Sequence, residues 1–338
     1  MYRMVLCTFL FIVTVYTVPV WAATPANPAA NAKAAAVLNY LEQLPQRSEG
    51  RMLSGQFCNY GLTATKQPCE EVFQVTGRWP AIIGLDYADW STSGLNTEIP
   101  NQVAIAYDKA GGWVTISAHI YNPANPAGGG LRDKGVDLKQ LLTPGTDTYT
   151  RWMLELDCLA AGLAALQEAN VVVLWRPFHE MNGGWFWWGA HDPADFIALW
   201  KQMFTYFTEI KKLNNLLWIY GPNHGSKTAD YYPGDHYVDI VGLDAYTDDI
   251  APKHIRGYEE ITQLPKPFAF TEFGPHGSRN PPGDYDYLRF LNGVKEHFPK
   301  AVFFLSWHDN WGLMKNKNTK ELLDNPWIVN RDNLPQIP

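Results

Sequence analysis

Val171-Val172-Val173-Leu174-Trp175-Arg176-Pro177-Phe178-His179-Glu180 is the stretch of sequence that decides the fold. Its first five residues form a short apolar run rich in β-branched side chains, which predicts a fully buried β-strand. Pro177 and the later Gly183-Gly184 pair interrupt regular strand pairing, so we expect the strand to end here. The sequence therefore places the imidazole of His179 and the carboxylate of Glu180 just beyond the C-terminal end of a buried strand.

Strand and helix patterns alternate along the rest of the chain. Short apolar runs predict eight strands, at residues 52–57, 81–86, 113–119, 171–178, 216–221, 238–244, 268–273 and 302–307. Helical patterns separate them, at residues 70–76, 99–110, 149–169, 193–213, 254–264 and 285–298. Apolar strands that alternate with helices indicate a parallel sheet covered by helices, and eight such units predict an α/β fold with a single (β/α)8 TIM barrel. A doubly wound open sheet is the alternative, but no glycine-rich phosphate fingerprint follows an early strand.

The first residues have the pattern of a secretory signal peptide. Arg3 supplies a positive charge, an apolar run follows, and Ala22 offers a small residue for cleavage, so residues 1–22 are predicted to be the signal. An uncleaved membrane anchor is the alternative, but the apolar run is short for a spanning helix. We expect a secreted protein that is not attached to a membrane after cleavage.

Composition indicates one domain, at residues 23–338, without a linker or an internal repeat. The net charge of −7 is moderate and no basic run occurs, so nothing supports nucleic acid or an anionic membrane as a partner. Aromatic residues make up 14% of the chain and charged residues only 18%, which is typical of a large core with a ring-lined cleft. We expect the protein to be a monomer.

Polar and aromatic side chains follow several of the predicted strands. His119 follows the third strand, Asp244 and Tyr246 the sixth, Glu272 the seventh and Trp307 the eighth. In a barrel of parallel strands the C-terminal ends meet at one mouth, where the active sites of this fold lie. Each residue alone could be a hydrogen-bonded core group, but so many strand ends converging with Glu180 favour an active site.

Six aromatic residues lie within the fourteen positions 175–188 around the His179-Glu180 pair. Flat rings stack on the apolar faces of sugars, and surroundings of low polarity raise the pKa of a carboxylic acid, as a general acid requires. In the alternative interpretation the rings are core and Glu180 is a solvated loop residue. We favour a sugar-cleaving site, because so many rings around one His-Glu pair is an unusual core design.

The segment Arg-Pro-Phe-His-Glu-Met-Asn-Gly, residues 176–183, followed by Trp-Phe-Trp-Trp-Gly, residues 185–189, closely resembles the acid/base segment of glycoside hydrolase family 26. The resemblance implies a retaining glycosidase on a (β/α)8 barrel, of a family in which most members are β-mannanases. It also implies that Glu180 is the acid/base and that Glu272, in Thr271-Glu272-Phe273-Gly274, is the nucleophile.

The same resemblance implies roles in substrate binding for residues near the two glutamates. Tyr246 is expected to hydrogen-bond the nucleophile, and His179 to contact both the nucleophile and the sugar. Trp307 is expected under the sugar at the cleavage point and Trp185 on the leaving-group side. His119 and Asp244 match positions that contact substrate, although a purely structural hydrogen bond is an equal alternative for these two. Asp309 follows Trp307 and is expected at the rim, whereas His308 stands where some members carry Arg.

The expected activity is endo-acting hydrolysis of β-1,4-mannan, with mannan, glucomannan or galactomannan as the polysaccharide substrate. A family relative that cleaves β-1,3-xylan or mixed-linkage β-glucan is the alternative among enzymes. A non-catalytic carbohydrate-binding barrel is a third hypothesis, but it has no need of two glutamates at strand ends. Sequence does not rank mannose against glucose, because the two differ only in the orientation of one hydroxyl.

The cysteines and histidines indicate a disulfide but no metal or cofactor. Cys58 and Cys69 lie in a loop-like segment and are predicted to form a disulfide in an oxidising compartment. Cys158 lies within an apolar helical pattern, which predicts a buried free thiol. The His179-Glu180-Met181-Asn182-Gly183 segment lacks the second histidine of a zinc-protease motif, so no metal site is expected.

Overall fold

The computed structural model describes residues 24–127, 129–277 and 281–337, so the predicted signal peptide lies outside the described residues. Eight parallel strands form the barrel: β2 (Gly55–Tyr60), β3 (Ile82–Asp86), β6 (Trp113–Ser117), β7 (Val173–Arg176), β8 (Leu216–Tyr220), β9 (Ile240–Tyr246), β10 (Phe268–Gly274) and β11 (Ala301–Ser306). Pairing between β10 and β11 and between β11 and β2 closes the ring. All eight predicted strands are present, and the (β/α)8 barrel is confirmed.

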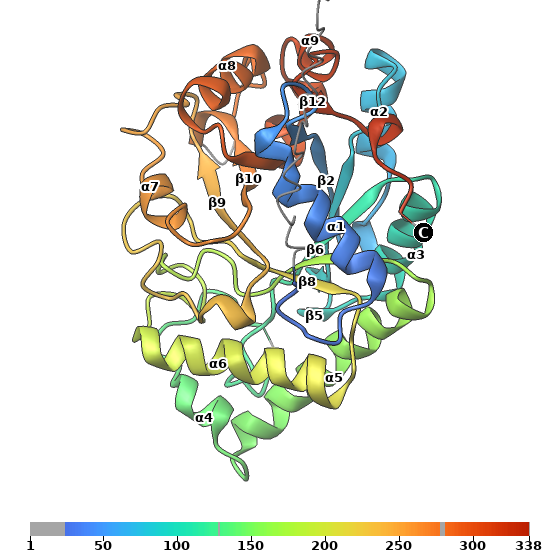
Figure 1. Ribbon diagram of the computed structural model, residues 1–338. Helices are drawn as coiled ribbons and strands as arrows, with labels where there is room; N and C mark the ends of the chain where they lie inside the picture. Colours follow the sequence, from blue (N-terminus) through green and yellow to red (C-terminus); the bar gives the residue numbers. More distant parts are fainter. Residues whose placement is uncertain (1–23, 128, 278–280, 338) are drawn as a thin grey trace, which may run out of the picture.

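Helices surround the barrel on its outer face (Figure 1). They are α2 (Gln67–Thr76), α3 (Glu98–Lys109), α4 (Leu138–Leu142), α5 (Asp147–Glu168), α6 (Pro193–Thr205), α7 (Tyr258–Ile261), α8 (Tyr287–His297) and α9 (Thr319–Leu323). Large apolar side chains fill the space between strands and helices, and six tryptophans are among the largest fully buried residues. A core of this size holds the strand ends in fixed positions, which a site built from several strands requires.

Two helical predictions were wrong in extent. The pattern at 254–264 forms only the single turn of α7, because Gly257 lies at φ +97° and interrupts the helical backbone. The pattern at 193–213 gives α6 only as far as Thr205, after which the chain continues as the π-helical turn Tyr206–Ile210. The β8–β9 connection, whose residues are all described, contains only the short 3₁₀ turn Asp235–Tyr237.

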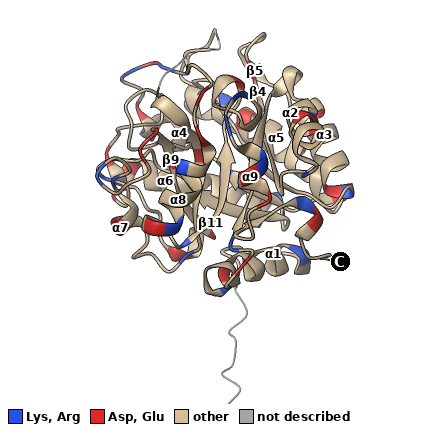
Figure 2. Ribbon diagram, turned by 90° about the horizontal axis from the view of Figure 1, so that it is seen from above, with Lys and Arg blue, Asp and Glu red and all other residues tan. Residues whose placement is uncertain are grey.

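An additional helix, α1 (Ala32–Gln43), closes the N-terminal end of the barrel. Asn31 caps it by accepting a hydrogen bond from the backbone N–H of Ala34. Its apolar side packs against buried side chains of the barrel strands, including Leu217 and Ile240. Figure 1 shows α1 crossing the centre of the strand ring, and Figure 2 shows it at the end opposite to β4 (Ala88–Asp89) and β5 (Gly94–Leu95). The C-terminal end of the barrel, which α1 does not cover, is therefore the end where a site can lie.

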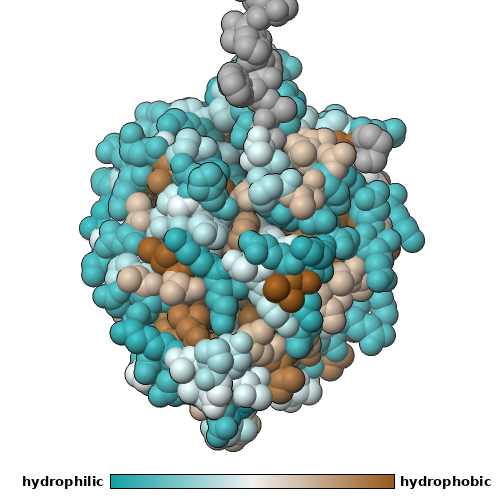
Figure 3. All heavy atoms as spheres, turned by 60° about the horizontal axis from the view of Figure 1, so that its bottom comes forward, coloured by the Kyte–Doolittle hydropathy of each residue, from teal (hydrophilic) through white to brown (hydrophobic). Residues whose placement is uncertain are grey.

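Neither view of the molecule shows a region of a single charge or a large apolar area. Lys and Arg lie interspersed with Asp and Glu in Figure 2. In Figure 3 the visible face is mostly hydrophilic, with separate small hydrophobic areas. Among the described residues, the helices are all too short or too polar to cross a membrane.

Candidate active site

Three carboxylates meet at the C-terminal end of the barrel. Glu180 follows β7, Asp244 lies in β9 and Glu272 lies in β10, and all three are buried. Oxygen atoms of the three side chains lie within 4.8 Å of one another. The structure therefore brings together Glu180 and Glu272, which are far apart in the sequence.

The backbone around Glu180 has an unusual conformation. Phe178 and Glu180 have φ values of +50° and +56°, in the left-handed region that non-glycine residues rarely occupy. The Glu180 N–H donates to the carbonyl of Gly221, at the end of the adjacent strand β8, over 2.8 Å. Strained backbone held by a neighbouring strand is a feature of functional sites, and here it turns Glu180 into the mouth.

Trp185 contacts Glu180 directly. Its indole N–H donates to Glu180 Oε2 over 2.6 Å, while 36% of the residue remains exposed. A Cβ at Gly183 would lie 2.3 Å from the Trp185 ring, so only glycine allows the ring to fold over this turn. Burial, followed by the charge of Glu272, raises the pKa of Glu180 to about 8, although the indole N–H and Arg176 act in the opposite direction.

Glu272 has two hydrogen-bond donors. Arg176, at the end of β7, donates to Glu272 Oε1, and the Tyr246 hydroxyl donates to Glu272 Oε2 over 2.6 Å. Burial and the neighbouring charge of Glu272 raise the pKa of Tyr246 well above its ordinary value, so the phenol stays protonated and remains a donor. These two contacts stabilise the ionised form of Glu272 in a buried position.

Arg176 also donates to Asp244 Oδ2 over 2.9 Å, and the Thr271 hydroxyl donates to Asp244 Oδ1 over 2.6 Å. The flanking carboxylates outweigh burial and raise the pKa of Arg176, which therefore remains a cation. Three oxygen ligands could in principle hold a metal ion, but the guanidinium already supplies the positive charge between two of them. The arrangement positions Glu272 and does not call for a metal.

A row of buried side chains leads from Asp86, at the end of β3, to Glu272. His119 Nδ1 donates to Asp86 Oδ2 over 2.9 Å, and His119 Nε2 lies 3.1 Å from His179 Nε2. His179 Nε2 lies 4.0 Å from Glu272 Oε1. Burial, then the charges of Arg176 and His119, lower the pKa of His179 well below its ordinary value, so this imidazole is neutral.

Trp307 lies at the opposite side of the mouth from Trp185. Its ring stacks on Phe57 with centroids 3.9 Å apart, and only 6% of the residue is exposed. His308 follows it and its Nε2 lies 3.3 Å from the Tyr60 hydroxyl. Asp309 is exposed, in agreement with the rim position expected from the sequence. The predicted site residues thus all lie at the same end of the barrel.

Most of the ring cluster that follows Glu180 is core, contrary to the sequence interpretation. Phe186 is 7% exposed, and Trp187 and Trp188 are almost fully buried. Trp187 donates its indole N–H to the carbonyl of Ile120, and Trp188 donates to the carbonyl of His179. Phe186, Trp187 and Trp188 therefore pack beneath the loop as part of the core. Of the four rings at 185–188, Trp185 is the one that is exposed to solvent.

The cysteines also differ from the sequence expectation. The Sγ atoms of Cys58 and Cys69 lie 3.3 Å apart, beyond the roughly 2.05 Å of a disulfide bond, so the pair is adjacent but not bonded in this structure. Cys158 is exposed and not buried, because it lies on the outward side of α5. The Cys158 prediction was wrong because an apolar pattern indicates that a helix has a buried face, but not which individual residues lie on that face.

Sequence reasoning missed four residues at this site: Arg176, Asp86, Tyr60 and Trp90. Arg176 is part of the quoted motif, and its charge inside an apolar strand was the available signal. Asp86 and Tyr60 end strands β3 and β2, so the rule that strand ends meet at one mouth could have found them. Trp90 lies in the loop between β4 and β5, 47% exposed and with its ring 5.6 Å from that of His119. A lone loop tryptophan gives no signal in the sequence.

Comparison with known proteins identifies relatives of the chain. The family described as Glycosyl hydrolase family 26 matches residues 26–333 of the chain. A curated relative from Bacillus subtilis (strain 168), named mannan endo-1,4-beta-mannosidase, is 39% identical over 96% of this chain and 94% of its own length. A second one of the same name from Bacillus subtilis is 39% identical over 91% of this chain and 88% of its own length.

Solved structures show the same fold. The structure of the Bacillus subtilis mannanase BCman superimposes with a TM-score of 0.87 and 36% sequence identity. The superposition covers 94% of this chain and 99% of that one. The similarity therefore extends over the whole barrel as well as the segment around Glu180.

Proposed function

The chain belongs to glycosyl hydrolase family 26, and on that premise we propose that it is a retaining endo-β-1,4-mannanase with Glu180 as acid/base and Glu272 as nucleophile. The observation that carries the proposal is the contrast between two adjacent glutamates. The pKa of Glu180 is raised to about 8, whereas Glu272 accepts hydrogen bonds from Arg176 and Tyr246. Two carboxyl groups about 5–5.5 Å apart with opposite protonation are what a retaining glycosidase requires.

In the first step Glu272 attacks the anomeric carbon and the glycosidic bond breaks. Glu180 donates its proton to the departing oxygen, so the leaving sugar departs as a neutral alcohol. The sugar on the retained side becomes covalently bound to Glu272. Trp185, which contacts Glu180, stacks on the leaving-group side, and Trp307 lies under the retained sugar.

In the second step the ionised Glu180 takes a proton from water, and the water oxygen attacks the anomeric carbon. The bond to Glu272 breaks, Glu180 is protonated again, and the configuration at the anomeric carbon is retained. Arg176 and Tyr246 stabilise Glu272 as it leaves with a negative charge. Neutral His179, held through His119 by Asp86, presents a ring to the sugar without adding charge, and Asp244 holds Arg176 in place.

Mannan, glucomannan or galactomannan is the proposed substrate, because two relatives that are 39% identical to this chain carry the name mannan endo-1,4-beta-mannosidase. We also propose that the protein is secreted after removal of residues 1–22 and that Cys58 and Cys69 become oxidised outside the cell. The adjacent positions of these two sulfur atoms support the last point, since little movement separates them from bonding distance.

Product analysis on mannan, glucomannan, β-1,3-xylan and lichenan tests the proposal. We expect manno-oligosaccharides from mannan, released initially as β-anomers that then mutarotate, which NMR detects. Preferential cleavage of β-1,3-xylan or lichenan would overturn the substrate assignment. An initial α-anomer would overturn the retaining mechanism.

A further inference from the structure

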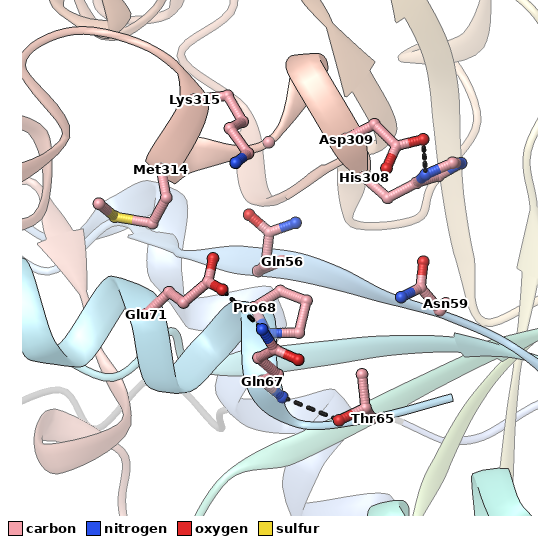
Figure 4. A pocket seen from close by; sticks show the side chains of 11 residues that line it. Gln56, Asn59, Thr65, Gln67, Pro68, Glu71, His308, Asp309, Met314 and Lys315 are labelled. Atoms are coloured by element: carbon pink, nitrogen blue, oxygen red, sulfur yellow. Dashed lines mark hydrogen bonds and ion pairs between the residues drawn. The ribbon is translucent and has the colours of Figure 1, made fainter. Parts of the chain in front are cut away.

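A single buried side chain, Gln56 of β2, holds both ends of the loop that follows β11. Its Nε2 donates to the carbonyl of Trp307 over 2.9 Å, and its Oε1 accepts a hydrogen bond from the N–H of Leu313 over 3.0 Å. The residue is only 2% exposed. In Figure 4 the Gln56 amide points from β2 toward this loop, which carries His308 and Asp309. One amide therefore closes the segment 307–313, which we call the β11 loop.

Gln56 lies at the seam where the barrel closes. The register between β2 and β11 pairs Gln56 with Ser306, the last residue of β11. An amide nitrogen has two N–H groups, and the two shortest contacts of this one are to the carbonyls of Trp307 and Phe57, both over 2.9 Å. A buried polar group that loses its partner costs free energy, so these contacts resist any shift of the β11 loop relative to β2.

Trp307 is the residue of the β11 loop that these contacts place most directly. Its N–H donates to the carbonyl of Phe273 over 2.9 Å, and Phe273 follows Glu272 in β10. Its own carbonyl accepts from Gln56, so the Trp307 backbone is fixed from both neighbouring strands. Its ring stacks on Phe57. Gln56 and Phe57, which are adjacent in β2, thus hold the backbone and the ring of Trp307 together.

We propose that Gln56 is a positioning residue, which keeps the Trp307 ring in place under the retained sugar by holding both ends of the β11 loop. The inference rests on the proposed mannanase function, in which Trp307 lies under the sugar that becomes bound to Glu272. Gln56 itself is too deeply buried to touch a substrate, so it acts through Trp307. A displacement of about 1 Å near a reacting centre can cost about a hundredfold in rate.

The alternative role for Gln56 is to close the barrel, without a specific effect on Trp307. A residue that only closes the barrel affects the rate independently of Trp307, whereas a residue that acts through Trp307 loses its effect once that ring is removed. The Tyr287 hydroxyl donates to the carbonyl of Trp311 over 2.7 Å, so the middle of the β11 loop stays attached when Gln56 is replaced. We therefore expect replacement of Gln56 to displace the loop and not to unfold it.

A double-mutant cycle between Gln56 and Trp307 tests the proposal. The variants are Gln56→Leu, Trp307→Ala and the two together, with kcat/KM measured on mannopentaose at a temperature where every variant is folded. We expect Gln56→Leu alone to lower kcat/KM about ten- to a hundredfold. In the Trp307→Ala background the same replacement should cost less than about threefold, because the two residues act as one unit. If Gln56→Leu does not fold, Gln56→Glu replaces it in the cycle, since it keeps the acceptor for the N–H of Leu313 and a similar volume.

Gln167→Leu is the matched control. Gln167 Nε2 donates to the carbonyl of Lys212 and its Oε1 accepts from the N–H of Asn214, so this amide also holds two backbone groups of one connection, before the start of β8. The control should lower kcat/KM by less than about threefold in both backgrounds. Equal losses from Gln56→Leu with and without the Trp307 ring, or a loss below threefold in the natural background, would overturn the positioning role. If the natural protein cleaves no mannopentaose, the proposed mannanase function itself fails.

Discussion

Replacing Tyr246 by phenylalanine removes one hydrogen-bond donor from Glu272 and leaves the ring in place. The hydroxyl donates to Glu272 Oε2 over 2.6 Å, where Glu272 is buried and Tyr246 is partly buried. A hydrogen bond to a charged acceptor contributes about 1.5–3 kcal/mol. If this contact stabilises the ionised nucleophile, its loss should move the acidic limb of the kcat/KM profile to higher pH.

The same free energy sets the expected loss of rate. Each 1.36 kcal/mol of lost transition-state stabilisation costs a factor of ten, so Tyr246→Phe should lower kcat/KM about ten- to hundredfold at the pH optimum. Some activity should remain, because Arg176 still donates to Oε1 of Glu272. The assay is the initial rate on a soluble manno-oligosaccharide, measured from acid to alkaline pH together with the melting temperature.

Tyr206→Phe is the matched control, because the Tyr206 hydroxyl donates to the carboxylate of Asp157 over the same 2.6 Å, but on the outer helices. That variant should keep the rate and both pH limbs. If Tyr246→Phe also keeps its acidic limb and loses less than threefold in rate, the hydroxyl does not support the nucleophile and the reasoning is wrong.

Four further predictions concern the acid/base and the cysteines. Glu180→Ala should lower polysaccharide hydrolysis by about 10²–10⁴ but spare much of the first step on activated phenolates, which leave without a proton and are measured as the first-turnover burst; equal losses in the burst and on polysaccharide would exclude the acid role. Because the pKa of Glu180 is raised to about 8, activity should fall as the pH rises through about 8. Trp185→Phe should move this limb to higher pH, since the indole N–H favours the carboxylate; an unmoved limb contradicts the contact. Denatured, unreduced protein should show one free thiol, Cys158, because Cys58 and Cys69 are expected to be oxidised to a disulfide. That disulfide would close a loop of about a dozen residues and stabilise the fold by roughly 3 kcal/mol. Three free thiols would refute the prediction.

The barrel could be predicted because its physical signals are local. A run such as Val171-Val172-Val173-Leu174-Trp175 is recognisable without knowledge of its neighbours, and eight such runs with helices between them leave few topologies. Parallel closure then brings the strand ends together, which is why Glu180 and Glu272 could be paired from sequence. The roles assigned to individual side chains came from the family resemblance and await the experiments above.

The features that sequence did not reveal depend on contacts between distant segments. Arg176 contacts both Asp244 and Glu272 only because the closed barrel brings the ends of β7, β9 and β10 together at one mouth. The burial of Trp187 and Trp188 depends on how the loop folds over the strand ends, which their spacing does not express. The positive φ of Glu180 is likewise invisible, since no glycine marks it.

Covalent labelling tests the central claim most directly. A fluorinated mannoside with a good leaving group should form a stable intermediate on the nucleophile, because fluorine slows both steps whereas the good leaving group speeds only the first. Peptide mass spectrometry of the natural enzyme should then place one sugar on Glu272, and Glu272→Ala should not be labelled. A label on Glu180, Asp244 or any other residue, or inactivation without a covalent sugar, would contradict the account.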